Sequence, residues 1–120
     1  METVEAITLD VGGTLIEPWP SVGHIYAEVA ARHGVQAEPE ELTRRFVQAW
    51  QAQDAFQYTR ADWSAVVDAT FKGLVTKLPS QTFFGELYSH FAKAECWNVY
   101  EDVIPTLTTL RQQGIRMAVI

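Results

Sequence analysis

The chain has 120 residues, of which 48% are hydrophobic and 20% charged. This composition predicts one folded domain with a hydrophobic core, or pieces of two, and excludes a disordered chain. The net charge of −6, with nine scattered lysines and arginines, argues against nucleic acid and anionic membranes as partners. The single cysteine, Cys96, permits no internal disulfide, fits a cytoplasmic protein and is expected to be a buried apolar residue. The N-terminal sequence shows no signal peptide or membrane span.

The first predicted element is a buried strand over residues 5–10, followed by a loop over 11–20 that glycines and prolines break. Four amphipathic helices are then expected, because apolar residues recur with helical spacing. They cover residues 21–33 with Ser21 as N-cap, a stretch from Pro39, residues 63–78 after a capping box at 59–62, and residues 80–91 with Ser80 as N-cap. A fifth helix is predicted at 101–113 and a second strand at 115–120.

This order predicts two domains. Residues 18–95 form a helical insertion that can bury its own core, and residues 1–17 and 96–120 begin another domain. The two strands are expected to be parallel because a long crossover separates them. Two strands and one helix do not cover a parallel sheet, so we expect an N-terminal, truncated part of a longer protein.

The candidate catalytic and binding residues lie in the stretch from Leu9 to Leu15, where an apolar strand ends in Asp10 and a glycine pair leads to Thr14. Ligands bind at the carboxyl ends of strands in open α/β sheets. Glycines let backbone N–H groups approach an anion such as phosphate, and a carboxylate beside them can attack phosphorus or hold a metal. The alternative is an ordinary tight turn in which Asp10 only caps the backbone.

These residues resemble the first motif, D-x-D-x-T-[LV], of the haloacid dehalogenase-like hydrolases, in the subgroup that has D-x-x-G-T-L. The sequences from Ser21 to Glu28 and from Arg32 to Gly34 are also similar to that subgroup. The resemblance covers essentially the whole chain. It implies an α/β fold in which a Rossmann-like core, with only its first two parallel strands present, carries an inserted four-helix cap, so that the chain is mostly helical.

The resemblance also implies roles for individual residues. Asp10 would be the nucleophile that forms an aspartyl-phosphate and would bind Mg²⁺, with the Gly12 carbonyl as a second metal ligand. The N–H groups of Val11 and Gly12 would contact the transferred group, and Thr14 would brace the loop. The expected function is a Mg²⁺-dependent phosphatase acting on a small phosphorylated metabolite. The family's other motifs would lie beyond Ile120, so the chain alone is expected to be inactive; its oligomeric state and substrate stay open.

One departure concerns Gly12, which stands where family phosphatases carry an aspartate that acts as general acid and base. Such a group contributes roughly 10²–10⁴-fold, so its absence predicts a slow phosphatase, one restricted to good leaving groups, or another proton source. Dehalogenases of the superfamily do not need this aspartate, but they resemble D-x-Y-G-T, which this chain lacks. A member without catalytic activity is a further alternative.

Two other interpretations stay open. The motif also resembles the first phosphate loop of sugar kinases with the actin-like ATPase fold, which predicts an antiparallel strand after Thr14. Aromatic stripes at 63–75 and 83–91 would serve a non-catalytic helical interaction module, although the favoured interpretation is that they pack against each other. Among the histidines, His24 lies near the motif loop and is a candidate for substrate binding or for the missing acid and base, although a surface or hydrogen-bonded histidine is the favoured interpretation. His90 is expected on a helix surface.

Overall fold

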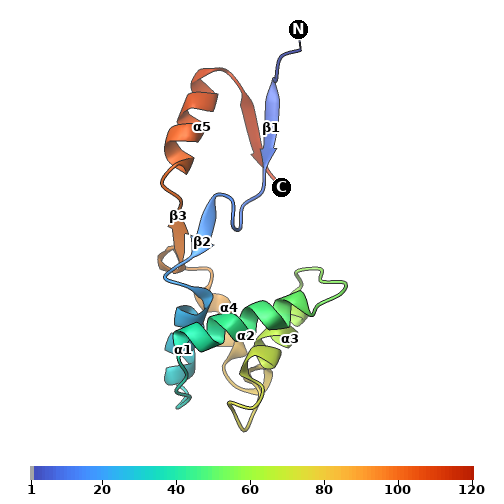
Figure 1. Ribbon diagram of the computed structural model, residues 1–120, viewed down its shortest axis with the longest axis vertical. Coiled ribbons are helices and arrows are strands. Elements are labelled where there is room, and N and C mark those ends of the chain that lie inside the picture. Colours follow the sequence, from blue (N-terminus) through green and yellow to red (C-terminus); the bar gives the residue numbers. More distant parts are fainter. Residues whose placement is uncertain (1) are drawn as a thin grey trace. The chain divides into compact units, whose positions relative to one another are not determined.

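A computed structural model describes residues 2–120 (Figure 1). They divide into two compact units: residues up to Pro18 with Trp97–Ile120 form the strand unit, and Trp19–Cys96 form the helical unit. No helix among these residues has the length and apolar character needed to cross a membrane. The elements of the strand unit are β1 (Ala6–Leu9), β2 (Ile16–Pro18), β3 (Trp97–Val99), α5 (Val103–Gln112) and β4 (Arg116–Val119). The elements of the helical unit are α1 (Val22–Ala31), α2 (Pro39–Gln51), α3 (Arg60–Phe71), the short 3-10 helices η1 (Pro79–Gln81) and η2 (Ala94–Cys96), and α4 (Phe84–His90).

In the strand unit, β1 pairs in parallel with β4, from Ala6 opposite Arg116 to Leu9 opposite Val119 (Figure 1). The predicted parallel pairing is therefore confirmed. The prediction of a buried strand is wrong for the described residues: along β1 exposed positions alternate with half-buried ones, Ile7 and Leu9 being half-buried. The reason is that β1 has a single partner strand within residues 2–120, so neither face of the pair is fully covered.

The predicted loop over residues 11–20 contains a strand that the sequence analysis missed. Strand β2 pairs antiparallel with β3, with Ile16 opposite Val99 and Pro18 opposite Trp97. Pro18 was interpreted as a breaker, but a proline only removes one hydrogen-bond donor and is tolerated at the edge of a short ladder. The strand that follows Thr14 therefore pairs with β3 and not antiparallel with β1.

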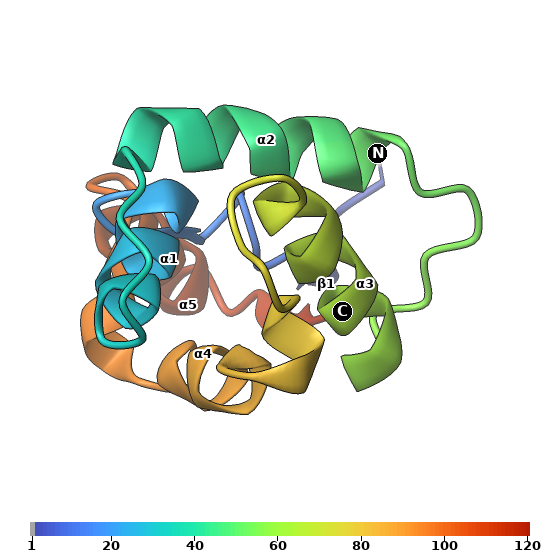
Figure 2. The same cartoon turned by 90° about the horizontal axis from the view of Figure 1, so that it is seen from below.

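In the helical unit, α1 packs on α2, α2 on α3, and α4 on α1, with α4 on the side opposite α2 (Figure 2). Tyr26 lies at the centre, with its ring centroid 5.9 Å from those of Phe46 and Phe71 and 6.0 Å from that of Phe91. Phe71 in turn contacts Phe83 at 5.2 Å. The aromatic residues of the predicted stripes thus pack within the unit, and burial raises the pKa of the Tyr26 hydroxyl.

Several helix starts agree with the sequence. The Ser21 hydroxyl accepts from the His24 N–H at the start of α1, and Pro39 occupies the first turn of α2. Both hydrogen bonds of the capping box between Thr59 and Asp62 are present. Backbone N–H donors of Gln57 and Thr59, with the Thr59 side chain, hold the pKa of Asp62 below its usual value.

Other predictions for this unit are wrong. Helix α3 ends at Phe71 rather than Leu78, because Gly73 adopts φ +85° and turns the chain. Ser80 does not cap a helix: it lies in η1, its N–H donates to Asp68 at 2.8 Å, and α4 starts only at Phe84. His90 is buried, with 4% of its surface exposed, and does not lie on the surface. Cys96 is buried as predicted.

Candidate functional site

The candidate site is the turn that follows β1. Asp10 comes directly after the last residue of the strand, so its carboxylate stands at the carboxyl end of a parallel pair. The Thr14 hydroxyl donates to Asp10 Oδ2 at 2.9 Å, and both residues are exposed. Thr14 therefore orients one carboxylate oxygen, while Oδ1 accepts no hydrogen bond from the described residues.

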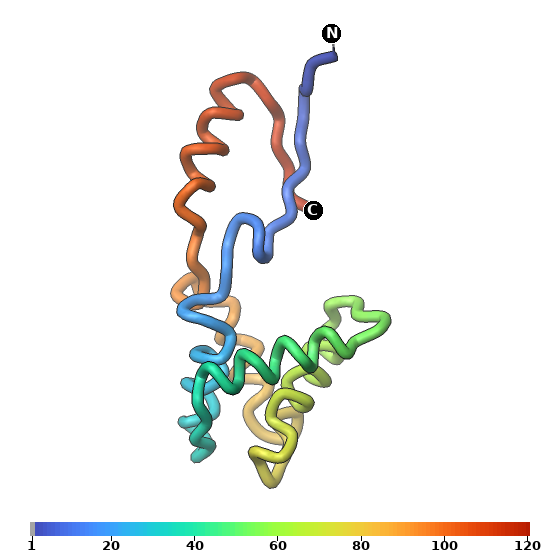
Figure 3. Tube along the Cα trace, in the orientation of Figure 1, coloured from blue at the N-terminus to red at the C-terminus, as the bar shows by residue number. Residues whose placement is uncertain are grey.

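The backbone of this turn is fixed by one carbonyl. Val11 accepts from the N–H groups of Leu15 at 2.8 Å and of Thr14 and Ile16 at 3.2 Å each. Gly13 adopts φ +79°, which side chains rarely permit, and its N–H donates to the Ile16 carbonyl at 2.8 Å. Figure 3 shows the resulting tight bend between β1 and β2. The sequence analysis predicted a turn here that depends on glycine, and Gly13 is the glycine that the turn requires.

Two backbone donors in this turn are available. None of the hydrogen bonds formed among residues 2–120 uses the N–H of Val11 or Gly12. Free N–H groups beside a carboxylate can hold the oxygens of an anion whose central atom the carboxylate approaches. These are the two donors for which the sequence analysis expected contact with a transferred group.

Gly12 itself is not required by space or by backbone conformation. A Cβ at this position would meet no heavy atom within 4 Å, and the φ angle of Gly12 is not in the left-handed region. A side chain at position 12 is therefore sterically possible, unlike one at Gly13, where the positive φ would strain it.

The oxygen donors of the turn suit a hard cation. The Asp10 carboxylate and the Gly12 carbonyl, which accepts no hydrogen bond from the residues described, are the ligand types that Mg²⁺ prefers. Mg²⁺ usually keeps several waters and takes one or two carboxylates. Nowhere in residues 2–120 do three or more histidine, cysteine, aspartate or glutamate side chains group in a way that could hold a metal ion. The turn therefore fits as part of a magnesium site.

The remaining candidate from the sequence, His24, is engaged at the start of α1. Its Nδ1 lies 2.7 Å from the Ser21 hydroxyl, which also accepts the His24 N–H. This contact accounts for the ring as part of the N-cap of the helix.

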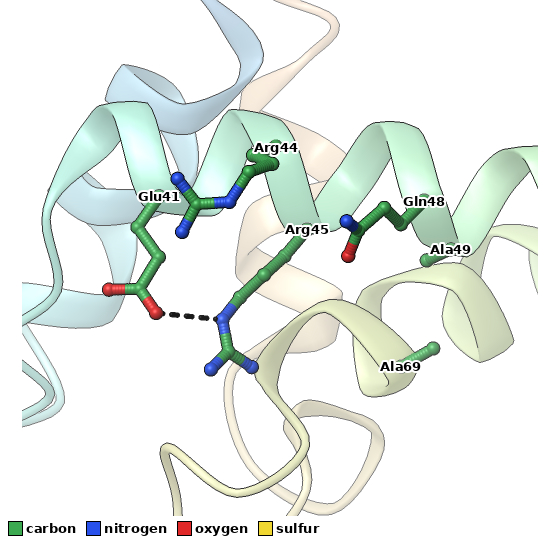
Figure 4. Close-up of a pocket in the computed structure, with 6 residues that line it drawn as sticks. All are labelled: Glu41, Arg44, Arg45, Gln48, Ala49 and Ala69. Atoms are coloured by element: carbon green, nitrogen blue, oxygen red, sulfur yellow. Dashed lines mark hydrogen bonds and ion pairs between the residues drawn. The ribbon is translucent and has the colours of Figure 1, made fainter.

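A hollow of about 490 Å³ on α2 and α3 contains none of the predicted site residues (Figure 4). Its lining includes Arg44, Arg45 and Gln48 on α2 and Ala69 on α3. Arg45 already donates to Glu41 at 3.0 Å and to the Lys72 carbonyl at 3.1 Å. This hollow lies on the surface of the helical unit and is lined by charged side chains. It is not the candidate site, which is the turn at Asp10.

Comparison with known proteins identifies the family. The model of the haloacid dehalogenase-like hydrolases matches residues 4–120. The chain belongs to this family. Two curated relatives, both named haloacid dehalogenase-like hydrolase domain-containing protein 3, are 31% identical: the human protein over 98% of this chain and the mouse protein over 95%. The chain spans about half the length of these relatives, 51% and 50%.

A solved structure shows the same fold. The crystal structure of a predicted phosphoglycolate phosphatase from Haemophilus somnus 129PT aligns with a TM-score of 0.62 at 23% identity, covering 100% of this chain and 52% of that one. The haloacid dehalogenase-like fold, with part of its Rossmann-like core and its helices, is thus established for the chain. The kinase alternative required a strand antiparallel to β1 after Thr14, and the parallel β1–β4 pair with the separate β2–β3 ladder disagrees with it.

Proposed function

We propose that this protein is a Mg²⁺-dependent phosphatase that acts on a small phosphorylated metabolite, with Asp10 as its nucleophile. The observation that carries the proposal is the arrangement of the turn: a carboxylate oriented by Thr14 lies beside two backbone N–H groups that donate to none of the described residues. Membership of a hydrolase family supports the reaction class.

In this proposal Asp10 Oδ1 attacks the phosphorus atom, forming a new oxygen–phosphorus bond as the bond to the leaving alcohol breaks. Water then hydrolyses the aspartyl-phosphate, releases phosphate and regenerates the carboxylate. The N–H groups of Val11 and Gly12 donate to the phosphoryl oxygens as charge develops on them. Thr14 keeps the carboxylate from rotating away. Mg²⁺, held by Asp10 and the Gly12 carbonyl, would neutralise charge on the phosphoryl group.

Position 12 of this site supplies no proton donor for the leaving group. Gly12 offers no proton, so the departing oxygen leaves as an alkoxide or takes its proton from water. We therefore expect faster turnover with phosphate esters of acidic alcohols than with simple alkyl phosphates. The same reasoning makes dehalogenation a second candidate, because halide leaves without a proton, but the motif carries no tyrosine before its second glycine.

We further propose that the helical unit acts as a cap domain and the strand unit as the start of the catalytic core. The unit boundaries at Pro18 and Cys96 support this division.

The nucleophile assignment is tested by Asp10→Asn in the protein at its full natural length. With p-nitrophenyl phosphate and Mg²⁺, we expect the substitution to abolish turnover, because an amide does not attack phosphorus. Thr14→Val is the graded comparison and should retain part of the activity, since the carboxylate remains. Unchanged turnover in Asp10→Asn would overturn the assignment, and activity on 2-haloacids in place of phosphate esters would favour the second candidate.

The missing acid is tested by Gly12→Asp, which has room for its side chain. General acid catalysis predicts a gain of up to roughly 10²–10⁴-fold, largest for alkyl phosphates with poor leaving groups. Gly12→Asn, equal in size but without an ionisable group, is the matched control. An aspartate variant that folds normally and shows no gain over the asparagine variant would contradict this explanation.

A further inference from the structure

The helical unit contains a cleft of about 400 Å³ whose lining includes His24 but no residue of the motif turn from Asp10 to Thr14. The backbone N–H of Trp19 donates to the Cys96 carbonyl at 2.8 Å, which holds the first and last residues of this unit together at the cleft. Helix α1 supplies one wall and the end of α4 with η2 another. The lining residues are Trp19, Pro20, His24, Ile25, Glu28, His90, Glu95 and Cys96.

His90 is the unusual residue of this lining. Its side chain is 4% exposed, yet its ring forms no hydrogen bond with any residue that the structure describes. Glu28 Oε2 lies 3.7 Å from Nε2, which is beyond hydrogen-bond distance but within reach of an ion pair when the imidazole is protonated. No fully buried side-chain nitrogen or oxygen lacks a partner among residues 2–120, and His90 itself lines the cleft. A nearly buried imidazole whose nitrogens form no hydrogen bond with the described residues can form one with a ligand.

The charge of the cleft indicates which ligand it takes. Among the described residues, two carboxylates, Glu28 and Glu95, line it together with His24 and His90, and no lysine or arginine does. Glu28 uses Oε1 to accept from Arg32 at 2.9 Å, which leaves Oε2 on the side of His90. The pKa of the Cys96 thiol reflects these negative charges. Burial raises this pKa, and the charges of Glu95 and Glu28 raise it further, whereas Lys93 lowers it. The cleft thus favours positive charge.

Besides His24, the remaining lining is apolar. Trp19 is 51% exposed, which is a large free ring surface, and Pro20 and Ile25 adjoin it in the lining. An aromatic face attracts cations and also covers carbon chains. Apolar walls combined with a few polar groups are the usual composition of a small-molecule site.

We propose that this cleft binds a small organic cation, an alkylammonium compound whose N–H donors are accepted by Glu28 and Glu95 and whose carbon chain lies against Trp19. The free nitrogen of His90 is a third acceptor for the ammonium group. Binding involves no covalent step and does not depend on the reaction proposed for Asp10.

The test is a titration of the isotope-labelled chain with n-pentylammonium, followed by backbone amide NMR. We expect saturable shifts confined to residues 19–28 and 90–96, with 1-pentanol at least tenfold weaker and pentanoate without effect. Glu95→Gln should weaken binding about fivefold, the size expected for an exposed ion pair. Glu40→Gln removes the same charge from an exposed glutamate outside the cleft and should leave the affinity within about twofold of wild type.

His90→Phe keeps a buried ring without acceptors and should also weaken pentylammonium binding, provided that the amide spectrum shows the native fold. If His90→Phe unfolds, the result for Glu95→Gln decides, because the Glu95 side chain is exposed and its substitution is not expected to disturb the fold. Equal affinity for pentylammonium and pentanol, shifts outside the cleft, no binding at the highest soluble concentration, or equal losses in Glu95→Gln and Glu40→Gln would each overturn the proposal.

Discussion

The strand unit and the helical unit bury their apolar residues very differently. Among the described residues, every buried hydrophobic side chain but one lies within Trp19–Cys96, the exception being Val103 at the start of α5. Along β4 and beyond, Val119 is 63% and Ile120 80% exposed. The helical unit thus has a core of its own, whereas the strand unit holds the motif turn on a thin, two-stranded support.

The residues that stabilise the fold and the residues of the candidate site are therefore held in place by different interactions. Packing of aromatic and aliphatic side chains determines the helical unit, and hydrogen bonds within a few residues of Asp10 determine the turn. Truncating a buried core side chain costs about 2–5 kcal/mol, and losing an exposed polar contact costs far less. Substitutions of the same kind should therefore have different effects in the two units.

The largest difference is expected for leucine-to-alanine changes. Leu42 in α2 is fully buried, so Leu42→Ala should lower the free energy of unfolding by about 3 kcal/mol or more. Leu9 in β1 is half-buried, and Leu9→Ala should cost about 1 kcal/mol. Urea unfolding followed by far-ultraviolet circular dichroism measures both. Equal losses would mean that the strand unit has a core comparable to that of the helical unit.

A somewhat smaller effect is expected at Gly23, where α1 meets the start of α2. A Cβ there would lie 1.8 Å from the Pro39 carbonyl oxygen and 2.4 Å from Thr43 Oγ1, so the helices must separate. Overpacking of this kind costs about 1–3 kcal/mol, which is the loss expected for Gly23→Ala in the same urea experiment.

Two glycine controls place this result within the comparison. Gly85 in α4 has only the far end of Arg60 at 3.5 Å, so Gly85→Ala should be neutral or stabilising through its helix propensity. Gly12 in the motif turn has open space, and Gly12→Ala should change stability by less than about 0.5 kcal/mol. A loss for Gly12→Ala as large as that for Gly23→Ala would show that the turn is sterically closed.

Local patterns in the sequence predicted much of this fold. The N-cap Ser21 and the capping box from Thr59 to Asp62 are interactions within four residues, and both form. The contact from Thr14 to Asp10 at the site also spans four residues, which is why its neighbourhood was recognisable before the structure.

Features that depend on distant partners escaped prediction. Strand β2 exists because β3, far along the chain, lies beside it, and the three residues Ile16–Pro18 carry no strand signal. The apolar period continues past Phe71 into Leu74 and Leu78, so periodicity alone does not show that Gly73 ends α3. The burial of His90 depends on the packing of α4 against α1, which no local pattern encodes.

The smallest expected effect concerns the surface of the helical unit, where Glu86 of α4 joins the end of α1. Its Oε2 lies 2.6 Å from His33 Nε2, and its Oε1 accepts from Arg32 at 2.8 Å. The hydrogen bonds from His33 and then Arg32 hold the pKa of Glu86 below its ordinary value of 4.5. Because the folded pKa is lowered, the stabilisation is present above about pH 4.5 and is lost as the pH falls through the lowered value.

Glu86→Gln should therefore reduce the urea midpoint slightly at neutral pH and leave it unchanged at a pH below the lowered pKa, so that the two curves converge in acid. Glu40→Gln changes the same charge at an exposed position of α2 without a hydrogen bond to any described residue, and it should not reproduce this convergence. Exposed ion pairs contribute little because solvent screens them. A loss for Glu86→Gln as large as that for Leu42→Ala would mean that charge pairing between α1 and α4, rather than the aromatic core, holds the helical unit together.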